Sequence, residues 1–315
     1  MSVLMTKGKA VFRLPSNAIS VGVVLLVLTG CAKAEPTTAS VPTPASVPTS
    51  TPTTATPLSG PYLGQKPPGM TPEVFAPGVV SDPSLFEYSG TFSPDGNEYY
   101  FNRITADSQH KLLVTKVVDG QWTAPEQLAL TAGYQAGEPH VTFDNKSLYF
   151  MWKRPVPEGK PGWPVYFVVD RTASGWSEPR YAGQGMFLSS SRDGQIYTTD
   201  MSASTTYLAR VTVADGVFLN YERLKIPNTS GGYAHPGIAP DGSYLLFDVD
   251  GSQLFVSFRR ADGTWGDAID LTEHGFDPMA GGPYVSPDGK YLFFGLKDDI
   301  WWVDSSVIEE LKPEQ

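Results

Sequence analysis

A short turn motif recurs five times along this chain of 315 residues, at almost constant spacing. Its aspartates lie 49, 49, 48 and 47 residues apart. A fixed period near 48 in a chain rich in Gly, Pro and aromatic residues predicts an all-β propeller, with one four-stranded blade per repeat. The five motifs are Ser93-Pro94-Asp95-Gly96, Thr142-Phe143-Asp144-Asn145, Ser191-Arg192-Asp193-Gly194, Ala239-Pro240-Asp241-Gly242 and Ser286-Pro287-Asp288-Gly289.

Each motif has the residues of a hairpin turn. Proline sets φ, the aspartate side chain caps the turn, and Gly or Asn accepts the positive φ that follows. An apolar strand comes next in each copy, as in Tyr99-Tyr100-Phe101 and Leu292-Phe293-Phe294. Such unbroken apolar runs predict strands buried between stacked blades. A second Gly-aromatic hairpin, such as Gly120-Gln121-Trp122, follows in the first four copies and closes each blade.

The fifth copy passes through Trp301 and Trp302 without such a hairpin after it. Near the other end of the repeat region, the segment 71–75 resembles 124–128, the outer strand expected in the first blade. We therefore predict that the N-terminal segment supplies the outer strand of the last blade, which would close the ring and remove two sheet edges. The expected fold is a five-bladed β-propeller, and a six-bladed ring is the alternative.

The Ser-Pro-Asp-Gly turns and the apolar strands after them resemble the WD40-like, TolB-like propeller repeats of bacterial envelope proteins, from residue 71 to about 310. The second and third copies depart from that pattern, because Phe143 and Arg192 replace the proline. The resemblance implies a fold and not an activity, since the shared residues are turn and core positions.

The first 30 residues have the layout of an export signal: Lys7, Lys9 and Arg13 precede an apolar run over 21–28. The run ends in Leu28-Thr29-Gly30-Cys31, which resembles a lipobox, so we expect Cys31 to be acylated and to anchor the chain to a membrane. An ordinary secretory signal with a coincidental cysteine is the alternative. Since Ala32 follows the cysteine, we expect the outer membrane in a Gram-negative cell, and otherwise the outer leaflet of the cell membrane.

Residues 31–60 are mostly Pro, Thr, Ser and Ala, which predicts an extended tether before a propeller domain over 61–315. The net charge of the chain is −10, and removal of the signal makes it more negative. This acidity argues against nucleic acid as a partner. It permits cationic ligands, neutral glycans and metal ions, although such acidity is also an ordinary solubility feature. The expected partner is an envelope protein or a glycan.

In a propeller, the segments before the innermost strands and the loops after the second strands share one face, which commonly binds ligands. The longest of these loops is 153–164, which contains four prolines. Five residues of this face are candidates for catalysis: Glu87, Glu138, His140, His235 and Asp250. Six are candidates for ligand binding: Arg103, Arg154, Asp200, Tyr233, Asp277 and Lys297.

His140 and His235 fall at nearly equivalent places in their repeats, where each could serve as a metal ligand, a general base or a contact between blades. Asp248-Val249-Asp250-Gly251 resembles the start of a calcium loop but lacks the later ligands. We therefore assign no cofactor, with calcium as a weak candidate, and no metal site.

Strong fold motifs together with the absence of a recognisable catalytic motif favour a non-catalytic binding or scaffolding module that holds an envelope protein or a glycan. The alternative is a carbohydrate-active enzyme, a glycoside hydrolase or polysaccharide lyase, because carboxylate and histidine side chains are expected on the ligand face.

Overall fold

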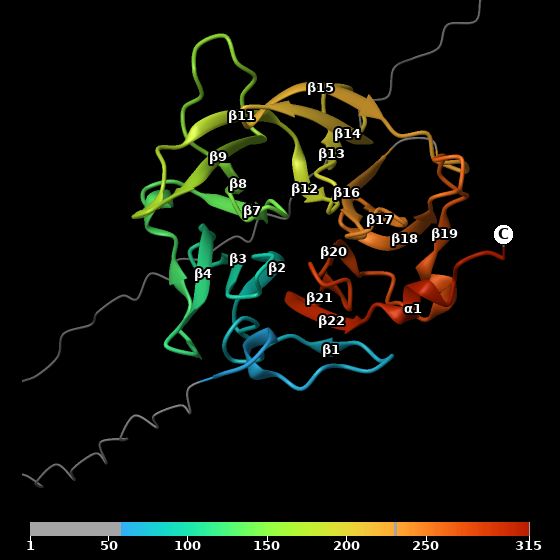
Figure 1. Cartoon of the computed structure of the whole chain (residues 1–315), viewed down its shortest axis with the longest axis horizontal. Helices are drawn as coiled ribbons and strands as arrows, with labels where there is room; N and C mark the ends of the chain where they lie inside the picture. The colour runs from blue at the N-terminus through green and yellow to red at the C-terminus, as the bar shows by residue number, and fades with distance from the viewer. Residues whose placement is uncertain (1–57, 230–231, 315) are drawn as a thin grey trace, which may run out of the picture. The chain divides into compact units, whose positions relative to one another are not determined.

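The structure, a computed structural model, describes residues 58–229 and 232–314. The predicted signal, Cys31 and the tether up to residue 57 lie outside these residues. Five antiparallel sheets follow one another along the described chain and are arranged as blades around a centre (Figure 1). The prediction of a five-bladed all-β propeller is confirmed, and we name the blades A to E in chain order.

Four strands form the core of each blade, and in blades A to D the innermost strand comes first in the chain. Blade A contains β2 (Phe86–Phe92), β3 (Glu98–Ile104), β4 (His110–Val118), β5 (Gln121–Trp122) and β6 (Glu126–Gln127). Blade B contains β7 (Ala136–Val141), β8 (Ser147–Trp152), β9 (Val165–Thr172), β10 (Gly175–Trp176) and β11 (Arg180–Gln184). Blade C contains β12 (Met186–Ser190), β13 (Ile196–Asp200), β14 (Tyr207–Ala214) and β15 (Val217–Arg223).

Blade D contains β16 (Tyr233–Ile238), β17 (Tyr244–Val249), β18 (Ser252–Phe258) and β19 (Ile269–Asp270). Blade E contains β20 (Gly281–Val285), β21 (Tyr291–Leu296), β22 (Asp299–Asp304) and β1 (Glu73–Val74). Helices are short: η1 (Tyr62–Gly64), η2 (Ala129–Thr131), η3 (Leu271–His274) and α1 (Ser306–Glu309). None of the helices in the described residues is long and apolar enough to cross a membrane.

The repeated motifs form the turns between the first and second strands of every blade. In blade A, the Ser93 hydroxyl donates to Asp95 Oδ1 at 2.5 Å, and the Asn97 N–H donates to the same oxygen at 3.2 Å. Gly96 takes φ +71°, a value that L side chains rarely adopt. These turns define one face of the propeller, called the turn face here.

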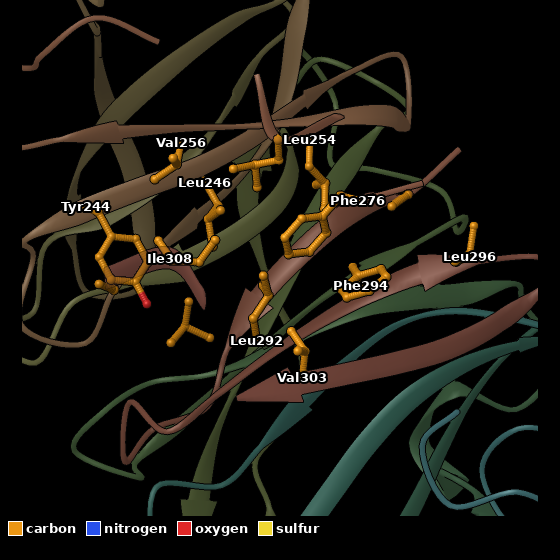
Figure 2. Close-up of a cluster of buried hydrophobic side chains, with 14 of the residues drawn as sticks. Tyr244, Leu246, Leu254, Val256, Phe276, Leu292, Phe294, Leu296, Val303 and Ile308 are labelled. Atoms are coloured by element: carbon orange, nitrogen blue, oxygen red, sulfur yellow. The ribbon is translucent and has the colours of Figure 1, made fainter. Parts of the chain in front are cut away.

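The apolar strands that follow the turns pack between neighbouring blades. Figure 2 shows the cluster between blades D and E, where Leu246 and Val256 meet Leu292, Phe294 and Val303. Similar clusters lie between the other neighbouring blades. Burial of these side chains holds each blade against the next one, because apolar area removed from water stabilises by roughly 25 cal/mol per Å².

The N-terminal strand β1 closes the ring. Glu73 pairs with Trp302 and Val74 with Trp301, so the predicted outer strand of the last blade is confirmed. Phe75 follows β1, is fully buried, and packs edge-on against Phe293 of blade E and Tyr99 of blade A. This closing segment, residues 73–80, thus joins the first blade to the last.

Candidate functional site

A β-bulge interrupts the innermost strand of every blade at the same place. The register shifts between Glu87 and Gly90 in β2, and corresponding shifts occur in β7, β12, β16 and β20. A bulge re-aims the side chain that it carries. The five equivalent residues directly after the start of each shift are Tyr88, Glu138, Phe187, His235 and Gly282, and the last four have positive φ. We call these five residues the axial ring.

The axial ring forms part of the lining of a cleft on the face opposite the turns. The cleft has two compartments, of about 500 Å³ and about 430 Å³, which share Tyr88, His110 and Glu138. The first is also lined by Phe86, Phe187, His235, Met279, Lys297 and Asp298. The second extends along Lys153, Trp163, Pro164 and three methionines, so the long loop predicted for recognition contributes to it.

Blade E opens the cleft because it contributes glycines where other blades contribute side chains. Gly281, Gly282 and Gly295 line the larger compartment. A Cβ on Gly282 would lie 2.8 Å from Cζ of Phe187, and one on Gly281 would lie 2.0 Å from the Gly251 carbonyl oxygen. The backbone itself forms this wall of the cleft, because a Cβ on Gly281 would meet backbone and one on Gly282 would require the Phe187 ring to move.

Glu138 lies at the base of both compartments and is only 9% exposed. Its Oε2 accepts a hydrogen bond from the Tyr166 hydroxyl at 3.0 Å and another from the Phe187 N–H at 2.8 Å. Burial raises the pKa of Glu138, while the charge of His235 and these two hydrogen bonds oppose that rise. The two hydrogen bonds to Oε2 therefore fix the orientation of the whole carboxylate group, including Oε1.

His235 is held by a carboxylate behind it. Its Nδ1 donates to Asp248, whose two oxygens are each 2.9 Å away. Asp248 is fully buried and also accepts from the N–H groups of Gly251 at 3.1 Å and Gly282 at 2.6 Å. Burial acts to lower the pKa of His235, but the hydrogen bond and charge of Asp248 outweigh it, so the pKa is raised. The Phe187 ring packs against the imidazole at 4.5 Å.

The rim of the cleft combines aromatic and basic side chains. The Tyr88 hydroxyl lies 3.1 Å from His110 Nδ1, and Lys153 Nζ lies 5.9 Å from the centre of the Trp163 ring. Burial and the positive charge of Lys153 lower the pKa of His110. On the other side, Lys297 Nζ is 3.8 Å from Asp277 Oδ2.

Of the residues predicted as site candidates, Glu138, His235 and Lys297 line the cleft, and Asp277 contacts Lys297. Several others hold the blades together. Arg103 Nε donates to the buried Glu87 at 2.5 Å and also reaches the Val79 and Val80 carbonyls, which ties blade A to the closing segment.

The remaining binding candidates have contacts within single blades. Arg223 Nε donates to Asp200 Oδ2 at 2.7 Å in blade C. The guanidinium of Arg154 lies over the Trp152 ring at 4.5 Å, and Tyr233 packs edge-on against Phe247 and Phe255. Asp250 occupies the turn between β17 and β18 with φ +50° and does not line either compartment.

The expectation that His140 and His235 occupy equivalent positions is wrong. His140 pairs with Tyr149, and the corresponding residue of blade D is Gly237, which pairs with Leu246. The residue of blade B that corresponds to His235 is Glu138. His140 therefore lies below the axial ring, 4% exposed, with Nε2 2.9 Å from Ser190 Oγ of blade C. Burial lowers the pKa of His140 to about 4, so it is neutral at pH 7.

Sequence reasoning missed His110, Phe187, Trp163 and Met279 as cleft residues. Phe187 could have been found from its spacing, since it lies 49 residues after Glu138 and 48 before His235. Trp163 and Met279 lie in loops, and His110 is the first residue of β4. The sequence carries no comparable signal for where these three side chains lie. No group of three or more His, Cys, Asp or Glu side chains able to hold a metal occurs in the described ranges 58–229 and 232–314.

No protein-family model matches the chain, and no curated protein matches its sequence. Solved structures with a similar fold include TolB from Acinetobacter baumannii, which is 15% identical over 68% of this chain with a TM-score of 0.45. The chain spans about half of that protein, 53% of its length. A gluconolactonase from Xanthomonas campestris is 13% identical over 79% of this chain and 97% of its own, with a TM-score of 0.43. Similarity at this level concerns the propeller fold alone.

Proposed function

We propose that this protein is a non-catalytic binding module of the bacterial cell envelope, which holds a glycan or a protein segment in the cleft. The observation that carries the proposal is the apolar mouth of the cleft. Phe86, Trp163 and Met279 are 37%, 51% and 66% exposed, and they are three of the seven exposed large hydrophobic side chains in the described residues. Exposed apolar side chains gathered around a cavity are typical of an interaction site.

The arrangement of the carboxylates favours binding over glycan cleavage. Glycoside hydrolysis uses two carboxyl groups on either side of one bond. Of the three carboxylates predicted as catalytic candidates, only Glu138 lines the cleft. The other carboxylate in the lining, Asp298, is exposed in the turn between β21 and β22, whereas Glu138 is buried. Glu87 is paired with Arg103, and Asp250 belongs to a hairpin turn.

The path of the chain into the propeller supports a role at an envelope surface. The Leu58 and Gly60 carbonyls accept hydrogen bonds from Trp122 at 2.8 Å each, and the Tyr62 hydroxyl donates to Asp288 at 2.7 Å. Asp288 belongs to a turn motif, so the chain enters at the turn face, opposite the cleft. A tether that begins at Cys31 would therefore join the propeller at the face opposite the cleft.

Ligand screening of the purified protein by thermal unfolding tests the proposal, with neutral and charged oligosaccharides and with peptides from envelope proteins. A ligand at 100 times its Kd stabilises the folded state by about 2.7 kcal/mol, which raises Tm by about 5 to 10 °C for a domain of this size. We expect Met279→Ser and Trp163→Ala to abolish the shift. The matched control is Leu219→Ser, because Leu219 is 62% exposed on β15 and does not line the cleft. A ligand that raises Tm equally in the wild type and in both cleft variants would contradict the proposal.

A further inference from the structure

Two polar atoms at the base of the cleft have no partner in the described part of the chain. Glu138 Oε2 receives two hydrogen bonds, whereas Oε1 receives none from residues 58–229 and 232–314. His235 Nδ1 is bound to Asp248, whereas Nε2 has no partner among the same residues. Both side chains line the larger compartment, and both are held rigidly from behind. Neither atom is among the fully buried side-chain atoms that lack a hydrogen-bond partner, so both are open to the cleft, where they can meet a ligand or water.

Phe187 connects these two groups. Its N–H donates to Glu138, and its ring packs on His235 at 4.5 Å, so the three residues form one unit of the axial ring. Gly282 completes the ring beside Phe187, and a Cβ there would lie only 2.8 Å from Cζ of the Phe187 ring, so this position carries no side chain. The unit therefore offers a hydrogen-bonding group on each side of an aromatic ring.

The charges around the cleft cancel. Lys153 and Lys297 line it together with the acidic Glu138 and Asp298, while the charge of His235 is compensated by Asp248 behind it. At the base, an anionic ligand group would be repelled by Glu138 and a cationic one by a protonated His235, and in each case the repulsion offsets the attraction of the other residue. A neutral ligand meets neither penalty.

The kind of neutral group follows from the hydrogen-bonding capacity of the two side chains. A carboxyl oxygen accepts when the group is ionised and can donate when it is protonated, and the imidazole Nε2 accepts when the ring is neutral and donates when it is protonated. A hydroxyl group can both donate and accept, so it satisfies Glu138 and His235 in every protonation state. Aromatic walls complement this pattern, because the apolar faces of sugar rings pack on aromatic side chains such as Tyr88 and Phe86.

We propose that the ligand is a neutral glycan, and that Glu138 and His235 bind hydroxyl groups of one sugar ring at the base of the cleft. This inference rests on the proposed binding function and specifies its ligand. The two residues are binding residues with no part in bond cleavage. The exposed Trp163 and Met279 then contact the neighbouring sugar units toward the mouth.

Isothermal titration calorimetry with maltohexaose, cellohexaose and chitohexaose tests the inference against charged probes, a polygalacturonate hexamer and a chitosan hexamer. For the neutral glycan that binds best, we expect Glu138→Gln to weaken binding about 10- to 100-fold, since hydrogen bonds to charged groups contribute about 1.5 to 3 kcal/mol. Gln keeps an acceptor for Tyr166 and Phe187, so the variant should remain folded, which circular dichroism checks. Leu219→Ser serves as the control and should bind as the wild type does.

A thermodynamic cycle separates direct contact from indirect effects. Analogues of the bound sugar that each lack one hydroxyl are titrated against the wild type, Glu138→Gln and His235→Gln. If Glu138 binds a hydroxyl, one analogue should lose affinity for the wild type and lose almost none for the Gln variant. Purely additive losses for every analogue would overturn the inference. So would tighter binding of a charged hexamer or a peptide in the cleft, although the binding function itself would stand. That function fails separately if no probe responds to Met279→Ser or Trp163→Ala.

Discussion

Replacing Asp248 with Asn tests whether the cleft is built around a charged pair. The carboxylate is fully buried and accepts from His235 Nδ1, Gly251 N–H and Gly282 N–H. Asn has nearly the same volume, but it has one acceptor oxygen, and its NH₂ group is itself a donor. At least one of the three donors must then face another donor, and the negative charge that holds His235 is lost.

The size of the effect follows from the partners that are lost. A buried hydrogen bond to a charged group contributes about 1.5 to 3 kcal/mol, and breaking a buried ion pair costs about 3 to 5 kcal/mol. Because Asn keeps part of this network, we expect a loss of about 2 to 4 kcal/mol in the free energy of unfolding at pH 5.5. For a domain of this size, the loss corresponds to a decrease in Tm of about 5 to 15 °C.

The loss should depend on pH in one direction. Folding raises the pKa of His235, so the stabilisation from the protonated pair is fully present below the unfolded-state pKa and disappears as pH rises through the folded-state pKa. Thermal unfolding of both proteins at pH 5.5 and pH 9, followed by circular dichroism, should give the larger difference at pH 5.5. Asp119→Asn is the control, because Asp119 is exposed in the hairpin between β4 and β5. A difference that is absent, or that grows toward pH 9, would refute the reasoning.

Three further predictions concern the centre of the propeller and the closure of its ring of blades. His140→Gln should remove part of the acid sensitivity of folding, because burial lowers the pKa of His140 from 6.5 to about 4. In urea titrations, the free energy of unfolding of the wild type should fall by about 3 kcal/mol more than that of the variant between pH 6.5 and pH 4. Equal losses in the two proteins would contradict this. Gly282→Ala should destabilise the protein more than Gly289→Ala and should also weaken ligand binding. Both glycines have positive φ, but only a Cβ at position 282 would come close to another atom, Cζ of Phe187 at 2.8 Å. Equal decreases in Tm for the two variants would show that Phe187 moves freely. Phe75→Ala should cost about 3 to 5 kcal/mol in urea unfolding, against almost nothing for Leu219→Ala, and a loss below 1 kcal/mol would mean that ring closure matters little.

The fold could be predicted because its signals are local and repeated. Each repeated turn motif fixes one hairpin, and the apolar strand after it can be buried only between two blades. Ring closure by β1 could also be predicted, because the strand that pairs with Trp301 and Trp302 had to come from outside the fifth repeat.

The site was harder to predict from the sequence, because the bulges change which side chains point toward the axis of the propeller. An even alternation along β7 would treat His140 as a residue of the ligand face, whereas the extra residue of the bulge turns Glu138 toward the cleft and leaves His140 packed against Ser190. Glu87 was misleading for another reason: a carboxylate near the cleft face is paired with Arg103 through contacts distant in sequence. Such contacts depend on the tertiary arrangement and leave no pattern in a single sequence.

The way in which the chain enters the propeller has a mechanical consequence. A pull on the N-terminal side would first load the hydrogen bonds from Trp122 to Leu58 and Gly60, and the Tyr62–Asp288 contact. The strand that closes the ring, β1, is only two residues long and lies further along the chain. These outer contacts would therefore carry the force before it reaches β1, so that a tethered propeller could bear tension while its ring stays closed.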